Sequence, residues 1–134
     1  MWENTTLRRF DLSYPKWSYA GAGLNSNISD LAKWDAALYT EKLVKQLERM
    51  WARTKLNSGQ TSDYGLGWMV FDLQGRKAVG QGGGRNNWIV RFVDDRLTII
   101  VLCNLFRADA LSLVKGVAAF YDPVSEAKEV KSPK

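Results

Sequence analysis

Between residues 64 and 105, apolar and β-branched side chains gather in runs that are separated by short polar or glycine-containing breaks. The runs lie at 64–71, 78–84, 88–93 and 97–105, and the breaks include the pairs Gln74 and Gly75, and Asp94 and Asp95. Short runs rich in Val, Ile, Trp and Phe between turn residues are typical of strands joined as consecutive hairpins. The sequence therefore predicts a four-stranded antiparallel meander.

Helical patterns precede this predicted sheet. Asn27, followed three residues later by Asp30, is a variant of the capping box, and it predicts a helix from about Ile28 to Tyr39. A second helix is predicted to begin near Leu43, on one apolar face that consists of Leu43, Val44, Leu47, Met50 and Trp51. We interpret this stripe as part of the core.

A further helix is predicted from Ala108 to Tyr121, where Asp122 and Pro123 stop it. Its apolar surface is broad and includes Leu111, Leu113, Val114, Val117, Ala118, Phe120 and Tyr121. A surface of this width is expected to pack on the face of the sheet. The predicted fold class is α+β, with an antiparallel β-meander packed against a C-terminal helix and preceded by two helices.

We expect residues 1–134 to form a single domain. Residues 1–19 are too apolar for a free tail and too irregular for a long helix, so they are predicted to be an extended packing segment. Residues 124–134 are polar and predicted to fray.

The composition is that of an ordinary globular protein, with 46% hydrophobic and 25% charged residues. The net charge of +5 is scattered along the chain. Nucleic-acid binding needs a clustered basic patch, so we do not expect it. We also expect no membrane segment, since no apolar run is long enough, and the start of the chain has no signal-peptide pattern. The sequence does not assign the protein to a cellular compartment.

The chain contains no histidine and a single cysteine. It therefore cannot supply a Ser-His-Asp triad, a Cys-His pair or an ordinary zinc site, and we expect no metal and no cofactor. Any catalytic base within this chain must be Lys, Tyr or a carboxylate. Cys103 lies in the most apolar predicted strand, where we expect a small buried hydrophobe, because reactive thiols need exposure and a positive neighbour.

The second predicted strand ends in a glycine-rich box, Gly-Gln-Gly-Gly-Gly at 80–84. Consecutive glycines weaken a strand and let another backbone or a ligand come close. Two interpretations stay open on the residues alone. The box is either a substrate-facing strand edge, or an edge whose glycines only permit sheet twist or close helix packing.

Four segments together resemble motifs of the serine β-lactamase-like family, which holds class C β-lactamases, D-alanyl-D-alanine carboxypeptidases and related esterases. Residues 64–68 match its Tyr-Gly-Leu-Gly-Trp motif at every letter, and 80–84 are similar to its Gly-His-x-Gly-Gly box. Residues 20–34 resemble its Ala-Gly-Gly-Leu stretch with the Asp-Leu-Ala-x-Trp that follows, and 101–105 resemble its Val-Leu-Thr-Asn strand. The resemblance implies the C-terminal part of a β-lactamase/transpeptidase-like fold.

The resemblance also implies a hydrolase that acylates a serine and then releases the acyl group to water. In the family the serine belongs to a Ser-x-x-Lys motif at a helix start, which lies upstream of the region matched here. Ser13 to Lys16 spells this motif, as does Ser125 to Lys128. Because the chemistry needs both side chains on one helical turn, and Pro15 lies in an irregular stretch, we interpret Ser13 and Lys16 as a decoy. The chain alone is predicted to be inactive.

The resemblance assigns substrate binding to Gln81, Gly82, Gly83 and Gly84, with the amide near Gly84 as one donor of an oxyanion hole. Gln81 stands where the family has His or Lys, and its neutral amide can form hydrogen bonds but supplies no charge. This change favours an alternative, a non-catalytic module that binds a peptide, a glycan stem or a partner protein through the same edge. A third hypothesis is an unrelated α+β domain with chance matches.

The expected ligand in the parent protein is a small-molecule or peptide substrate: a β-lactam, a D-amino-acid peptide or an ester. A chain cut from a larger fold is also expected to expose apolar surface. We therefore expect this chain to self-associate or to swap segments with a second copy.

Overall fold

The computed structural model describes residues 2–3, 6–7, 9, 21, 23–83, 87–105 and 108–121. Its elements are β1 (Trp2–Glu3), β2 (Thr6–Leu7), α1 (Ile28–Leu38), the 3-10 turn η2 (Leu47–Arg49), β3 (Met69–Leu73), β4 (Arg76–Gly83), β5 (Asn87–Phe92), β6 (Leu97–Val101) and α2 (Ala110–Phe120). Ser13, Lys16, Gly84, most of the 1–19 segment and the 124–134 tail lie outside the described residues.

The predicted meander is confirmed as a four-stranded antiparallel sheet in the order β3-β4-β5-β6. Gln74 and Gly75 form its first turn with φ of 56° and 75°, which is the backbone of a two-residue hairpin whose twist matches the strands. β3 is shorter than the predicted run and begins at Met69, while Tyr64 pairs with Met69 only as an isolated bridge.

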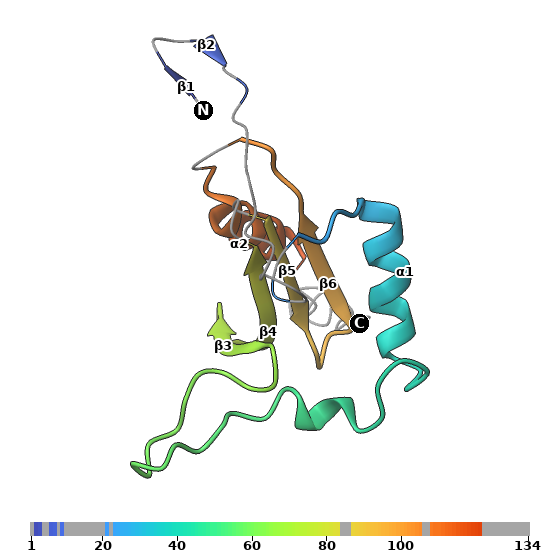
Figure 1. Ribbon diagram of the computed structural model, residues 1–134, viewed down its shortest axis with the longest axis vertical. Coiled ribbons are helices and arrows are strands. Elements are labelled where there is room, and N and C mark those ends of the chain that lie inside the picture. The colour runs from blue at the N-terminus through green and yellow to red at the C-terminus, as the bar shows by residue number, and fades with distance from the viewer. Residues whose placement is uncertain are drawn as a thin grey trace, which may run out of the picture.

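The sheet separates two apolar layers, and in Figure 1 its strands lie between α2 and α1. On one face, Val90 and Phe92 of β5 pack with Val114 of α2. On the other face, Val79 of β4 packs with Leu38 of α1 and with residues of the segment that follows it. The period of two along each strand sends neighbouring side chains to opposite layers. Both faces of the sheet are therefore covered.

The helix predicted from about Leu43 is corrected to the single turn η2. Glu41 and Gln46 have φ of 53° and 54°, and this left-handed backbone cannot continue into an α-helix. The expectation of a core role is confirmed for most of the stripe, since Leu47 is buried and the residues packed around it are Val44, Met50 and Trp51. Leu43 is exposed.

α2 confirms the predicted closing helix. Asp109 caps its start, because Oδ1 accepts from the Ser112 amide at 3.0 Å and Oδ2 accepts from the Ser112 hydroxyl at 2.6 Å. These bonds from Ser112 hold the pKa of Asp109 below its ordinary value. Asp109 therefore becomes protonated, and the cap loses its charged acceptor, only when the pH falls below the ordinary pKa of a carboxyl group.

Only one side of α2 reaches the sheet. Its buried residues are Ala110, Val114 and Ala118. The expectation that the whole apolar surface packs on the sheet is corrected, because four of its side chains are exposed: Leu113, Val117, Phe120 and Tyr121. A helix presents a single stripe to a flat layer, and these four lie on the remaining surface.

A buried ion pair joins α1 to the sheet. The Arg91 side chain is 1% exposed, and its Nε lies 2.6 Å from Oδ1 of Asp35. The Thr98 hydroxyl donates to the same oxygen at 3.0 Å. The guanidinium carbon lies 4.4 Å from the ring centre of Tyr39 and 4.9 Å from that of Trp51. Its Nη atoms have no hydrogen-bond partner within the described residues, so the aromatic faces and the single carboxylate surround the charge.

In the described part of the chain, no helix has the length and apolar character needed to cross a membrane.

Candidate functional site

An open groove of about 1180 Å³ lies at the end of the sheet where β4 finishes. Its walls come from α1 and the segment before it, from the loop that precedes β3, from the start of β5 and from the chain that follows β6. Small-molecule sites are usually concave, mostly apolar and lined by a few polar groups. This groove has that character.

β4 extends beyond its neighbour β3 at the groove. The last residue pair between these strands is Met69 with Gly80. β4 continues its pairing with β5 through Gln81, Gly82 and Gly83. The other side of these three residues has no strand partner among the described residues, so this edge of β4 is open to an added strand or a ligand.

The positions of the glycine-rich box differ in whether packing requires glycine there. A Cβ at Gly82 would lie 2.9 Å from the Trp88 ring, and one at Gly80 would lie 2.8 Å from the Ile89 carbonyl oxygen. Close packing within the sheet therefore explains both. A Cβ at Gly83 would meet no atom closer than 3.5 Å. Packing does not require glycine at position 83. Because Gly83 has no side chain, the end of the β4 edge stays open.

Gln81 is half-buried at the groove and is held by Tyr64. The Tyr64 hydroxyl donates to Oε1 of Gln81, and Nε2 of Gln81 lies 3.4 Å from the Gly82 carbonyl oxygen, to which it donates. The contact joins the loop that precedes β3 to the edge of β4. It places a neutral amide in the groove at the position where the resemblance leads one to expect a cation.

Tryptophans build the apolar wall. Trp34 of α1 stacks on Trp68, with ring centres 5.9 Å apart and an interplanar angle of 3°. Trp68 is buried, whereas Trp34 is 39% exposed, and both line the groove together with Trp88. Stacked rings hold each other in place, so this wall is rigid on the side of α1.

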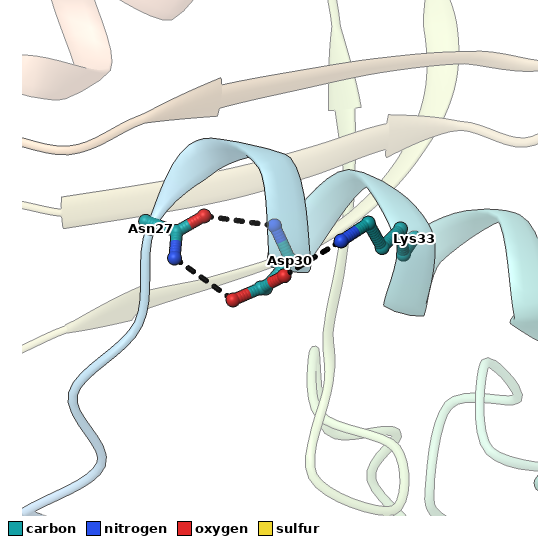
Figure 2. A network of polar contacts seen from close by, with 3 residues as sticks. All are labelled: Asn27, Asp30 and Lys33. Atoms are coloured by element: carbon teal, nitrogen blue, oxygen red, sulfur yellow. Dashed lines mark hydrogen bonds and ion pairs between the residues drawn. The ribbon is translucent and has the colours of Figure 1, made fainter.

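Asp30 lines the groove, and Figure 2 shows it at the start of α1 between Asn27 and Lys33. The Asn27 Oδ1 accepts from the Asp30 amide at 2.9 Å, and the Asn27 Nδ2 donates to Asp30 Oδ2 at 2.8 Å. This confirms the predicted capping pair. Lys33 Nζ lies 3.0 Å from Asp30 Oδ1. The bonds from Lys33 and then from Asn27 hold the pKa of Asp30 below its ordinary value, so its carboxylate is ionised at neutral pH.

Segments of all four sequence motifs meet at this groove, although they are distant in the chain. They contribute Gly21, Asp30 and Trp34; then Leu66 and Trp68; then Gln81, Gly82 and Gly83; and finally Leu102, Cys103 and Asn104. The family model described as Beta-lactamase matches residues 2–119. The chain belongs to the β-lactamase family. This membership excludes an unrelated α+β domain whose motifs match by chance.

Within the β-lactamase family, the chain is similar to penicillin-binding protein 4* of Bacillus subtilis (strain 168). The two are 36% identical over 87 residues, which cover 60% of this chain and 19% of that protein. The chain therefore spans about a fifth of the length of this curated relative. No solved structure was found to match the chain.

No Ser-x-x-Lys pair within the described part of this β-lactamase-family chain lines the groove. The Ser-x-x-Lys spacing occurs a third time, from Ser112 to Lys115, within an otherwise apolar sequence. It lies on the first turns of α2. The Ser112 hydroxyl donates to Asp109 at 2.6 Å, which gives it a capping role away from the groove.

Cys103 is half-buried in the groove wall and follows β6, which ends at Val101. The expectation of a buried residue inside a strand is corrected, because the chain leaves the sheet two residues earlier. The Cys103 amide donates to Oδ1 of Asn87 at 2.6 Å. This bond holds the chain after β6 against the start of β5. Among the described residues, no cluster of three His, Cys, Asp or Glu could hold a metal ion.

Proposed function

We propose that this chain is the C-terminal part of a β-lactamase-like serine hydrolase and forms one wall of its acyl-binding site. The observation that supports the proposal is the convergence of four family motifs on one groove beside the free edge of β4. The parent would hydrolyse a β-lactam, a D-amino-acid peptide or an ester through an acyl-serine. The nucleophile would come from a part of the parent protein that this chain does not contain.

The free edge suits the acyl portion of a substrate. Backbone groups at Gln81, Gly82 and Gly83 would pair with an extended acyl chain as an added strand does. By the family resemblance, the amide near Gly84 would point at the carbonyl oxygen, where negative charge develops as the serine attacks. Fixed donors at that position lower the barrier because the charge forms only in the transition state.

The proposal predicts that the chain alone is not acylated. We expect no covalent adduct in its intact mass after exposure to a fluorophosphonate or, separately, to a penicillin, since no activated serine lines the described groove. A serine hydrolase labelled in the same tube checks the reagents. A stoichiometric adduct mapped to Ser13 or Ser112 would contradict the proposal, because the nucleophile would then lie within this chain.

A non-catalytic binding module is the second candidate, and the observation in its favour is Gln81. Its neutral amide, held by Tyr64, can bind a peptide or a neutral carbonyl but cannot supply charge to a reaction. The coding sequence upstream of Met1 separates the two candidates. A helix-borne Ser-x-x-Lys followed by Tyr-x-Asn there would favour the enzyme.

We also propose that the chain self-associates through the outer surface of α2. Leu113, Val117 and Phe120 are 56%, 50% and 95% exposed, and Lys115 is the one charged residue of this helix. Helices that are apolar on all sides are normally buried. Gly116 lies between these side chains, and a Cβ added there would meet no atom within 4 Å, so a second helix can approach closely.

Light scattering on the purified chain is expected to show a dimer or larger species. Phe120→Glu should shift the chain towards the monomer, because a charge cannot be buried in an apolar interface without a partner. Leu56→Glu is the matched control, since Leu56 is a half-exposed leucine of the loop before β3. A monomer at all concentrations, or equal effects of the two substitutions, would contradict the proposal.

A further inference from the structure

The polar lining of the groove is almost uncharged. Among the described lining residues, Asp30 is the one ionisable acid or base apart from the Cys103 thiol. Asp30 is already paired with Lys33 at 3.0 Å and bonded to Asn27. The other polar side chains are a hydroxyl and four amides, namely Ser26, Asn25, Gln81, Asn87 and Asn104.

The groove is also unusually apolar for an open surface. Leu24, Leu66 and Leu102 line it and are 89%, 62% and 41% exposed. Trp34, which is 39% exposed, lines the same groove. Exposed apolar surface rimmed by polar groups is typical of a ligand-binding groove. A ligand gains here by burying hydrocarbon or aromatic surface.

A carboxylate meets no cation among the described residues that line this groove. Entry removes water from the anion, and this cost is recovered only where a cation or several donors replace the water. Gln81 already accepts from Tyr64 through Oε1 and donates towards the Gly82 carbonyl through Nε2. Among the described lining residues no cation can balance an anionic ligand, and the nearby Lys33 is already paired with Asp30 at 3.0 Å. A neutral carbonyl needs no such partner.

We propose that the groove takes uncharged acyl compounds, such as neutral esters, in preference to compounds that carry a carboxylate. This inference rests on the proposed function, because it assumes that the groove is the acyl site. It selects among the three substrate types named above and favours the ester. The apolar side of the compound would lie on Trp34 and the leucines, and its carbonyl would meet the amides of the β4 edge.

The test compares two probes with one skeleton, methyl phenylacetate and the phenylacetate anion. The readout is the indole N–H signals of the full chain in ¹⁵N NMR spectra. The signals of Trp34, Trp68 and Trp88 report on the groove, and the backbone amide of Gly75, in the turn between β3 and β4 and outside the groove lining, is the internal reference in the same spectra. We expect the ester to shift the groove signals with a dissociation constant at least about fivefold lower than that of the anion.

Gln81→Lys is expected to tighten phenylacetate binding by about tenfold, because a charge-assisted hydrogen bond replaces a neutral one. The readout is the change in the phenylacetate constant relative to the ester constant, because loss of the contact between Gln81 and Tyr64 affects both ligands. Gln60→Lys is the matched control, since it adds the same charge in the exposed loop before β3, outside the groove lining, and it should change neither constant.

The outcomes separate the two proposals. Equal or tighter binding of phenylacetate by the unchanged chain would overturn the inference while leaving the groove as an acyl site. An unchanged phenylacetate constant in Gln81→Lys would overturn it as well, because charge at Gln81 would then not matter. Failure of both probes to move the three groove indoles of the folded chain would overturn the proposed function itself.

Discussion

Asp35→Leu is expected to lower the free energy of unfolding by about 4 kcal/mol, which is the cost of leaving a buried charge without its partner. Arg91 is 1% exposed, and its Nε lies 2.6 Å from Oδ1 of Asp35. Without Asp35, the guanidinium keeps the aromatic rings of Tyr39 and Trp51 beside it but loses its carboxylate. Urea denaturation followed by circular dichroism measures the loss.

Two controls separate the buried charge from other causes. Asp94→Leu makes the same change at an exposed turn residue and should alter stability by no more than about 0.5 kcal/mol. Adding Arg91→Met to Asp35→Leu should recover most of the loss, since an apolar pair of similar volume often replaces a buried ion pair without cost. A double variant as unstable as Asp35→Leu alone would show that the loss comes from packing and not from charge.

Gly65→Ala is expected to destabilise the chain by about 3 kcal/mol, at the upper end of the usual cost of overpacking. A Cβ at Gly65 would lie 2.1 Å from the Met50 carbonyl oxygen and 2.8 Å from that of Ala52. Both contacts are with backbone, which cannot rotate away as a side chain can. The Gly65 amide also donates to the Trp68 carbonyl at 2.8 Å, so the groove wall should shift and the indole signal of Trp68 should move.

Gly116→Ala is the matched control for this substitution. No atom lies within 4 Å of a Cβ at Gly116, which is inside α2, where alanine is favoured over glycine by about 0.5–1 kcal/mol. Denaturation at low protein concentration should therefore show a gain in stability. A loss in Gly65→Ala no larger than about 0.5 kcal/mol would mean that the loop before β3 relaxes freely.

Local chemistry was enough to predict much of the fold. Gly75 favours positive φ, so the position of the first turn could be predicted locally, although Gln74 also adopts a φ of 56° there. Asn27 and Asp30 mark the start of α1 because the Asn27 side chain accepts from the Asp30 amide, three positions away, and donates to the Asp30 carboxylate. The family motifs are equally local, and their segments line one groove at the end of β4.

The sequence gives no comparable signal for contacts between distant segments. An apolar stripe predicted a helix near Leu43, yet the same side chains reach the core from an irregular segment, since burial does not require helical backbone. The broad apolar surface of α2 predicted complete packing, but one helix offers one side to a sheet. The surface that is left exposed led to the proposal of self-association.

The sequence by itself determined the order of the elements, the turns and caps, and membership of the β-lactamase family, because these depend on neighbouring residues. The tertiary structure decided what depends on residues far apart. Asp35 meets Thr98 across 63 positions, which places α1 beside β6, and the free edge at Gln81 exists because β3 ends its pairing at Gly80. The charge of a groove is the sum over segments that only folding brings together, and so the proposal of an uncharged ligand rests on the tertiary structure and not on any motif.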